Sequence, residues 1–229
     1  MRRSSAVPIA GALILLVALT VGVLEPGAVR TVDWQAHLWI DGHLQGDLAR
    51  GISMVPAWLG QRGVVVVPLL AFALLTAMRQ RSLRPVLVTL AALAGIAVVV
   101  LLFKVGVGRT APAVGRDAVR AGGLSYPSGH AVNALVCWAL VLEFAAVLGP
   151  RAAKALPPRR RRIITGAIAL GAGVGMTTLD YHWVSDTVAG WLVGGLILTA
   201  VLALGPVRAG APSISPSARP EPSRPSPSA

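Results

Sequence analysis

Six long apolar runs constrain this chain more than any other feature of its sequence. They cover residues 8–24, 63–78, 86–103, 131–148, 163–179 and 187–204. Each run would form a helix about 25 Å long, since an α-helix rises about 1.5 Å per residue. The hydrocarbon core of a bilayer is about 30 Å thick, so flanking residues would anchor the ends. The runs therefore predict an all-α integral membrane bundle of about six transmembrane helices.

Composition and charge agree with a membrane location. The 229 residues are 55% hydrophobic and only 13% charged, yet the net charge is +12. The basic residues flank the apolar runs instead of covering a polar face, which speaks against nucleic acid as a partner. Such clusters are typical of membrane-protein loops. The single cysteine, Cys137, lies inside an apolar run, where we expect a buried packing residue.

The basic residues also predict an orientation. With the N-terminus in the cytoplasm and six spans, 14 of the 21 Lys and Arg residues fall on cytoplasmic segments and 7 on outer ones. This asymmetry predicts a multi-pass cell-membrane protein with both termini in the cytoplasm. The first run could also be a cleaved signal peptide, but residues 25–27, Glu-Pro-Gly, form a poor cleavage site. We expect a retained span, and cleavage would leave five spans in the same orientation.

The chain divides into three parts. Residues 1–84 hold an N-terminal pair of spans with an outside loop, 85–205 form a membrane core, and 206–229 are a Pro/Ser-rich tail that we expect to be disordered in the cytoplasm. In the outside loop, three tryptophans favour an amphipathic segment at the membrane interface, while His37 and His43 are expected to be ordinary loop residues. Glycines in the last two runs predict closely packed helices.

Three short stretches at the ends of runs could carry chemistry. The first stretch, 104–112, leaves the third run and contains Lys104 and Arg109. The second, Ser125-Tyr126-Pro127-Ser128-Gly129-His130, enters the fourth run. The third, 180–186, lies between the fifth and sixth runs and contains His182 and Asp186. The predicted topology puts all three stretches on the outer face. Four of the seven outer basic residues lie in one of these segments, 104–129, which suggests a role beyond topology.

The second stretch and its basic neighbours suit an anion. Exposed N–H groups at a helix start form a natural cradle with the Ser128 hydroxyl and the flexible Gly129. Lys104 and Arg109 add fixed positive charge, and an arginine can contact a phosphate through two nitrogens. These four residues are therefore candidate phosphate-binding residues.

The histidines suit nucleophilic catalysis. His182 and Asp186 are four residues apart and share one face of a helix. The carboxylate could then hold the tautomer of an imidazole that attacks phosphorus. His130 could protonate the leaving oxygen. Two histidines, one aspartate and a cationic cradle together predict phosphoryl transfer through a phosphohistidine.

Each of these residues has an ordinary interpretation as well. A histidine at a membrane edge is usually interfacial, and Ser-Gly before a helix is a common cap. Their combination on one face, with no histidine inside a run, favours a site. Two histidines and an aspartate could also bind zinc, but Lys104 and Arg109 would repel a cation. We therefore expect neither metal nor cofactor.

The chain resembles the type 2 phosphatidic acid phosphatase, or lipid phosphate phosphatase, family over about 85–205. The resemblance rests on Pro-Ser-Gly-His at 127–130 followed by the spaced His182 and Asp186. It implies a phosphatase-like core that works without a metal. By this resemblance His182 is the nucleophile, Asp186 orients it and His130 is the general acid, with phosphate contacts from Lys104, Ser128 and Gly129.

Two positions depart from the family pattern, which has phosphate-binding arginines where this chain has Ala111 and Met176. Losing one preorganised donor typically costs about 10²–10³ in rate. Arg109, two residues before Ala111, is the expected substitute. Arg116 or Arg120 could also reach back from the loop.

The leading prediction is a membrane phosphatase that hydrolyses a lipid phosphomonoester or diphosphate at the outer face, with the bilayer as its surroundings. Polyprenyl diphosphate, phosphatidic acid and phosphatidylglycerol phosphate are the candidate substrates by resemblance. The alternative is a catalytically impaired phosphate- or lipid-headgroup-binding membrane protein. A transporter is a third hypothesis, but only Glu143 is an ionisable residue within a run, near the predicted cytoplasmic end. The sequence does not indicate an oligomeric state.

Overall fold

The computed structural model describes residues 3–205, and the predicted tail at 206–229 lies outside them. Regular structure in this range is helical. The elements are α1 (Arg3–Leu24), α2 (Ala28–His43), α3 (Asp47–Trp58), α4 (Arg62–Gln80), α5 (Arg84–Val107), the 3₁₀ turn η1 (Pro112–Val114), α6 (Gly129–Ala146), α7 (Pro150–Ala155), α8 (Pro158–Thr178) and α9 (Val184–Ala203). The predicted all-α fold is confirmed.

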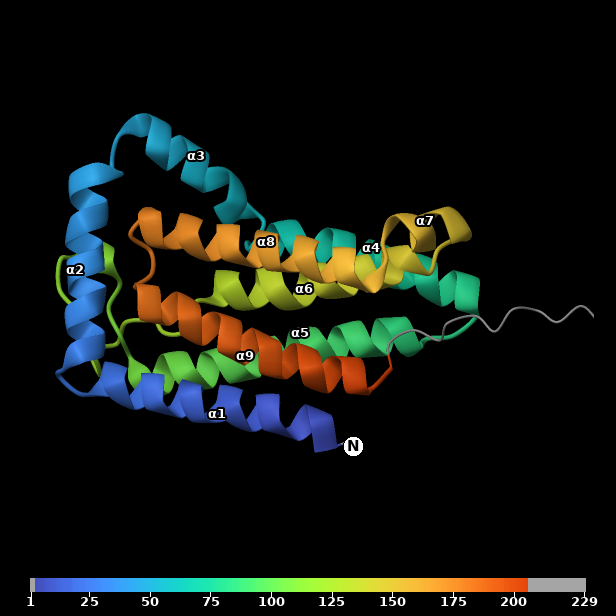
Figure 1. Cartoon of the computed structure of the whole chain (residues 1–229), viewed down its shortest axis with the longest axis horizontal. Helices are drawn as coiled ribbons and strands as arrows, with labels where there is room; N and C mark the ends of the chain where they lie inside the picture. The colour runs from blue at the N-terminus through green and yellow to red at the C-terminus, as the bar shows by residue number, and fades with distance from the viewer. Residues whose placement is uncertain (1–2, 206–229) are drawn as a thin grey trace, which may run out of the picture.

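Each of the six apolar runs lies in a long helix. Helices α1, α4, α5, α6, α8 and α9 run side by side along the length of the molecule (Figure 1). Five segments are long and apolar enough to cross a membrane, namely Val7–Leu24, Asp47–Gln80, Arg84–Val114, Gly129–Val147 and Val184–Ala203. The sixth run, in α8, falls outside this set because α8 begins with four arginines and is rich in Gly and Thr. A membrane crossing by α8 stays a prediction.

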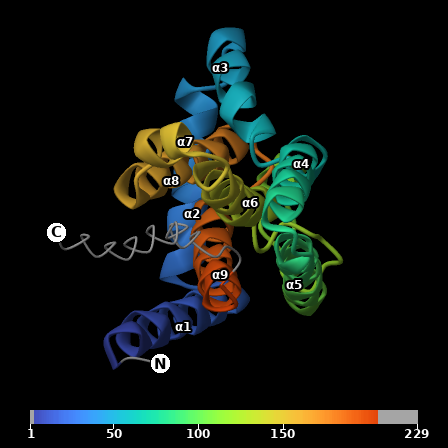
Figure 2. The ribbon, with the colours of Figure 1, turned by 90° about the vertical axis from the view of Figure 1, so that its right-hand side faces the viewer.

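Helix α6 forms the centre of the bundle. In the end-on view it is surrounded by α4, α8 and α9, all of which pack against it (Figure 2). Its residues Val132, Val136, Leu140 and Phe144 have no exposed surface. Cys137 on the same helix is also fully buried, as expected.

Glycines let neighbouring segments approach the last two long helices closely. A Cβ on Gly175 of α8 would lie 2.5 Å from the backbone oxygen of Ser53 in α3. A Cβ on Gly190 of α9 would lie 2.7 Å from the backbone oxygen of Ser128. By contrast, Gly195 has open space around it. The packing role predicted for these glycines therefore holds at particular contacts and not along the whole helix.

The predicted outside loop is mostly helical, which corrects the expectation for its histidines. Helix α2 stands across one end of the bundle, and α3 slants back along it (Figure 1). His37 lies within α2, and His43 is its last residue, with Nδ1 2.7 Å from the Trp39 oxygen. Asp33 of α2 is only 2% exposed. This helix therefore covers the end of the bundle instead of hanging free as a loop.

Candidate active site

The three predicted stretches meet at the end of the bundle that α2 covers. Helix α5 brings Lys104 to this end, where α6 and α9 both begin. The backbone N–H of Ser128 donates to the backbone oxygen of Asp186 at 2.9 Å. The ring centroids of His130 and His182 lie 6.4 Å apart. Which side of the membrane this end faces stays a prediction.

A pocket of about 630 Å³ lies between these segments. Lys104, Gly129, His130 and His182 line it, and Ala111 and Met176 lie in the same wall. Within the described residues, no aspartate or glutamate lines this pocket. The pocket therefore combines two imidazoles and fixed positive charge, and it suits an anionic group.

Asp186 contacts His182 on the side of the imidazole away from the pocket. Its Oδ2 lies 3.6 Å from His182 Nδ1, and the carboxylate is fully buried. The same oxygen accepts hydrogen bonds from the Trp183 N–H at 3.0 Å and from the Ser125 hydroxyl. Because Nδ1 faces this carboxylate, Nε2 is the nitrogen left to react in the pocket.

Ser125 begins the second predicted stretch, but no role could be assigned to it from the sequence. Its hydroxyl donates to Asp186 and lies 3.4 Å from His182 Nδ1, so it contacts both members of the pair. It also lines the pocket. Its place two residues before Pro127 was the only available signal.

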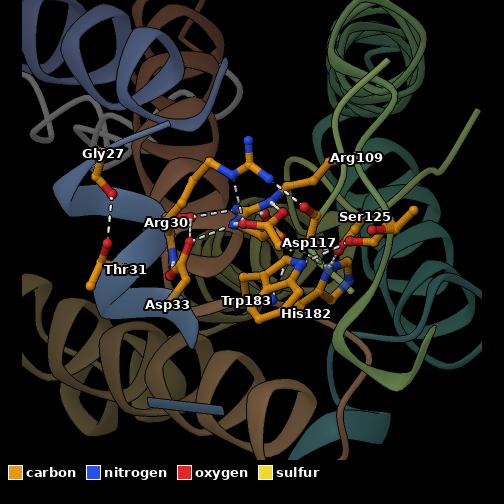
Figure 3. Close-up of polar contacts among 12 residues, drawn as sticks. Gly27, Arg30, Thr31, Asp33, Arg109, Asp117, Ser125, His182 and Trp183 are labelled. Atoms are coloured by element: carbon orange, nitrogen blue, oxygen red, sulfur yellow. Dashed lines mark hydrogen bonds and ion pairs between the residues drawn. The ribbon is translucent and has the colours of Figure 1, made fainter. Parts of the chain in front are cut away.

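Arg109 lies in a cluster of carboxylates, and Figure 3 shows its contacts with the aspartates around it, Asp33 and Asp117 among them. Its Nε donates to Asp117 at 2.8 Å, Nη1 to Asp186 at 2.9 Å, and Nη2 to Asp33 at 2.8 Å. Arg109 is 0% exposed, and its guanidinium carbon lies 5.0 Å from the centroid of the Trp183 ring. Each guanidinium nitrogen therefore has a protein acceptor. The geometry places Arg109 on the Asp186 carboxylate and not among the residues that line the pocket. The sequence predicted a phosphate-binding residue here.

Helix α2 and the loop after η1 complete this cluster. Arg30 of α2 donates from Nε to Asp117 at 3.0 Å. Burial works to raise the pKa of Asp117, but the hydrogen bonds and charges of Arg109 and Arg30 outweigh it and hold the pKa below its ordinary value. Gly123 gives the backbone room here, since a Cβ would lie 2.1 Å from the Arg109 oxygen. Arg116 and Arg120, the other predicted substitutes, are exposed in this loop.

The remaining predicted phosphate ligands have different surroundings. Lys104 lines the pocket and donates from Nζ to the Leu124 oxygen. Ser128 is fully buried, and its Oγ accepts from the Ala131 N–H at 3.4 Å as the N-cap of α6. The Ser128 hydroxyl thus supports the helix start, while Gly129 lies in the pocket wall.

A second histidine–carboxylate group lies between α2 and the turn that follows α8. His37, Asp41 and Asp180 offer ligand atoms within 4.8 Å of one another. His37 Nδ1 is already 3.1 Å from Asp180, and Gln45 donates to the same carboxylate at 2.9 Å. Burial, with the charge of Asp41, raises the pKa of Asp180. These contacts join α2 to the segment before His182, and no further feature within residues 3–205 marks a metal site.

Comparison with known proteins adds the family. Residues 85–208 match the model of the PAP2 superfamily. A solved structure with a similar fold is described as the first transmembrane PAP2 type phosphatidylglycerolphosphate phosphatase from Bacillus subtilis. It aligns with a TM-score of 0.70 and 19% identity, over 86% of this chain and 95% of that chain. No curated protein matches the sequence. Since the family model spans more than half of the residues, the chain belongs to the PAP2 superfamily.

Proposed function

We propose that this chain is a metal-independent membrane phosphatase that hydrolyses a lipid phosphomonoester or diphosphate through a phosphohistidine on His182. The observation that carries the proposal is the pocket itself. It gathers His130, His182 and Lys104 from three separated segments into one cavity. Family membership supports a phosphatase, and the apolar helices support a lipid substrate.

The reaction has two steps. In the first, His182 Nε2 attacks phosphorus, the bond to the leaving oxygen breaks, and His130 gives that oxygen a proton. In the second, His130 takes a proton from water, the resulting hydroxide attacks phosphorus, and orthophosphate leaves His182. Asp186 stabilises the positive charge on the imidazole in both steps.

Other residues bind or position. Lys104 and the Gly129 N–H contact the phosphoryl oxygens in this proposal. Arg109 acts on the site through Asp186, because its hydrogen bond fixes the carboxylate that orients His182. Ser125 holds the other carboxylate oxygen. Arg109 is thus a positioning residue in place of the phosphate ligand expected from the sequence.

The proposed location is the cell membrane, with both termini in the cytoplasm and the pocket on the outer face. Its support is the asymmetry of basic residues. Cys137 is the only cysteine and is buried, so cysteines placed singly in exposed loops can be labelled selectively. Labelling of a cysteine at residue 116, which is exposed in the loop after η1, from outside intact cells would support this orientation.

The experiment that tests the function is phosphate release by detergent-purified protein from a panel of lipid phosphates and diphosphates, with EDTA present. The panel contains phosphatidic acid, phosphatidylglycerol phosphate and a polyprenyl diphosphate. EDTA-resistant release by the wild type and none by His182→Ala is the expected result. Release that EDTA abolishes, or that His182→Ala retains, would contradict the proposal.

The second candidate is a phosphate- or headgroup-binding protein with impaired catalysis. The observation that favours it is the apolar pair Ala111 and Met176 in the pocket wall. The double variant Ala111→Arg/Met176→Arg separates the two candidates. A large gain from near-zero turnover would favour the impaired protein, whereas substantial turnover before and after would favour the enzyme.

A further inference from the structure

One basic residue in the pocket wall has no role so far. Arg62, the first residue of α4, lines the same pocket as Lys104, His130 and His182. Within residues 3–205, its exposed side chain has no hydrogen bond or ion pair with a side chain or backbone oxygen. An unpaired guanidinium at a cavity is free to bind an anion.

The backbone before Arg62 is fixed against the start of α6. The Gly60 oxygen accepts from Asn133 Nδ2 at 3.3 Å, and the Leu59 oxygen accepts from Trp138 Nε1 at 2.8 Å. A Cβ on Gly60 would lie only 2.6 Å from the His130 oxygen. The turn just before Arg62 therefore packs directly on the backbone of the proposed general acid, and it fixes the start of α4 beside the pocket that Arg62 lines.

The pocket has few other ways to neutralise a phosphoryl group. Arg109 is buried among three carboxylates, while Ala111 and Met176 are apolar. Lys104 already donates one N–H to the Leu124 oxygen. Lys104 and Arg62 are therefore the two fixed cations of this wall within the described residues. Arginine suits the task because its planar fork can contact two phosphate oxygens at once.

We propose that Arg62 binds the phosphoryl group of the substrate, together with Lys104, from the wall formed by α4 and α5. This inference rests on the proposed function, since it names a ligand of the same site. It assigns the phosphate contact to a residue from outside the segment that carries the motifs. It also gives the first residue of α4 a direct part in substrate binding.

The test compares Arg62→Ala and Arg62→Lys with the wild type, and Arg50→Ala serves as a matched control. Arg50 is an exposed arginine on α3 that does not line the pocket. The readouts are KM for the lipid substrate, inhibition by orthophosphate, and thermal unfolding in detergent. Arg62→Ala should weaken orthophosphate inhibition and raise KM about tenfold or more, because a charge-assisted contact is lost. Arg62→Lys should fall in between, and Arg50→Ala should match the wild type.

A binding measurement keeps the result separate from turnover. Orthophosphate should raise the unfolding temperature of the wild type at constant ionic strength, and it should do so less for Arg62→Ala. Binding that depends on Arg62 in a protein that hydrolyses no lipid would overturn the proposed function and support this inference. Normal KM and phosphate inhibition in folded Arg62→Ala, with active wild type, would overturn the inference alone. Absence of both binding and turnover in the wild type would overturn both.

Discussion

The Arg109 cluster and the neighbouring pocket differ in whether their positive charges are paired with carboxylates. In the cluster, Arg109 is fully buried, and its ion pairs with Asp33, Asp117 and Asp186 are each 2.8 or 2.9 Å long. In the pocket, Arg62 and Lys104 face a cavity without a carboxylate among the described residues. A buried charge must be paired to be tolerated, because it has lost its contact with water. A charge at an open cavity keeps that contact and remains available to bind a ligand.

The difference shows that closeness in sequence to a family motif does not by itself identify a residue that binds phosphate. Arg109 is close in sequence to the expected phosphate-binding position, but its partners are protein carboxylates. Arg62 is distant in sequence and shares the pocket with both histidines. Asp186 joins the two regions, because one oxygen accepts from Arg109 and the other lies beside His182.

Replacing Arg109 by methionine should have the largest effect on both regions. Removing one partner of a buried pair leaves the carboxylates uncompensated and costs about 3–5 kcal/mol. Arg109→Met should therefore unfold at a much lower temperature and lose activity, as measured by thermal unfolding and phosphate release in detergent. Arg50→Met, at an exposed position, should change stability by only about 0.5 kcal/mol. A stable Arg109→Met with weakened phosphate affinity would break the comparison and return Arg109 to the pocket.

Replacing His130 by asparagine should affect the pocket alone. Loss of a general acid typically lowers the rate by about 10²–10⁴-fold. Within residues 3–205 the His130 ring lies at the pocket with its centroid 6.4 Å from that of His182, and it forms no hydrogen bond. Stability should therefore stay near that of the wild type. Steady-state turnover and thermal unfolding of the same preparation would show this split. Full activity in His130→Asn would remove the residue from the mechanism.

Asp117→Asn should weaken the cluster with a defined pH dependence. The replacement loses charge-assisted hydrogen bonds worth about 1.5–3 kcal/mol each. The pKa of Asp117 is lowered in the folded protein, so its stabilising effect is present above the unfolded pKa, about 4. That effect is lost as the pH falls through the folded pKa. Thermal unfolding should thus separate wild type and variant at pH 7 and bring them together at low pH. A difference that grows on acidification would contradict this cluster.

Thr20→Val should have the smallest effect. Thr20 of α1 lies 2.7 Å from the Tyr126 hydroxyl, which joins the first helix to the loop before α6. The variant leaves a buried hydroxyl without this partner, at a cost of about 1 kcal/mol. Tyr126→Phe should cost less, since Thr20 still donates to the Leu16 oxygen. Equal, large losses of activity in both variants would show that α1 acts on the site directly.

The long helices could be predicted because each apolar run carries its own signal. The start of α6 and the spacing of His182 and Asp186 are likewise local signals. The alternating direction of successive spans then predicted that both lie at the same end of the bundle. For α2, the tryptophans favoured an amphipathic segment in the predicted outside loop, but its position over the end of the bundle could not be predicted, because that position depends on contacts with distant residues.

Long-range pairing could not be predicted from local patterns. Asp33 and Arg109 are 76 residues apart, and no periodicity connects a charge in the outside loop with one after α5. In the sequence, Arg62 is a basic residue that directly precedes the apolar run 63–78. Its place beside the histidines depends on how the α3–α4 turn packs against α6.

The most direct test of the central claim is to trap the intermediate. Protein mixed with a lipid substrate labelled in the phosphoryl group would be quenched in alkali within a turnover, digested and mapped. An alkali-stable, acid-labile label on the peptide containing His182, absent from His182→Ala, is the expected result. A label on another residue, or continued hydrolysis by His182→Ala, would contradict a phosphohistidine at this position.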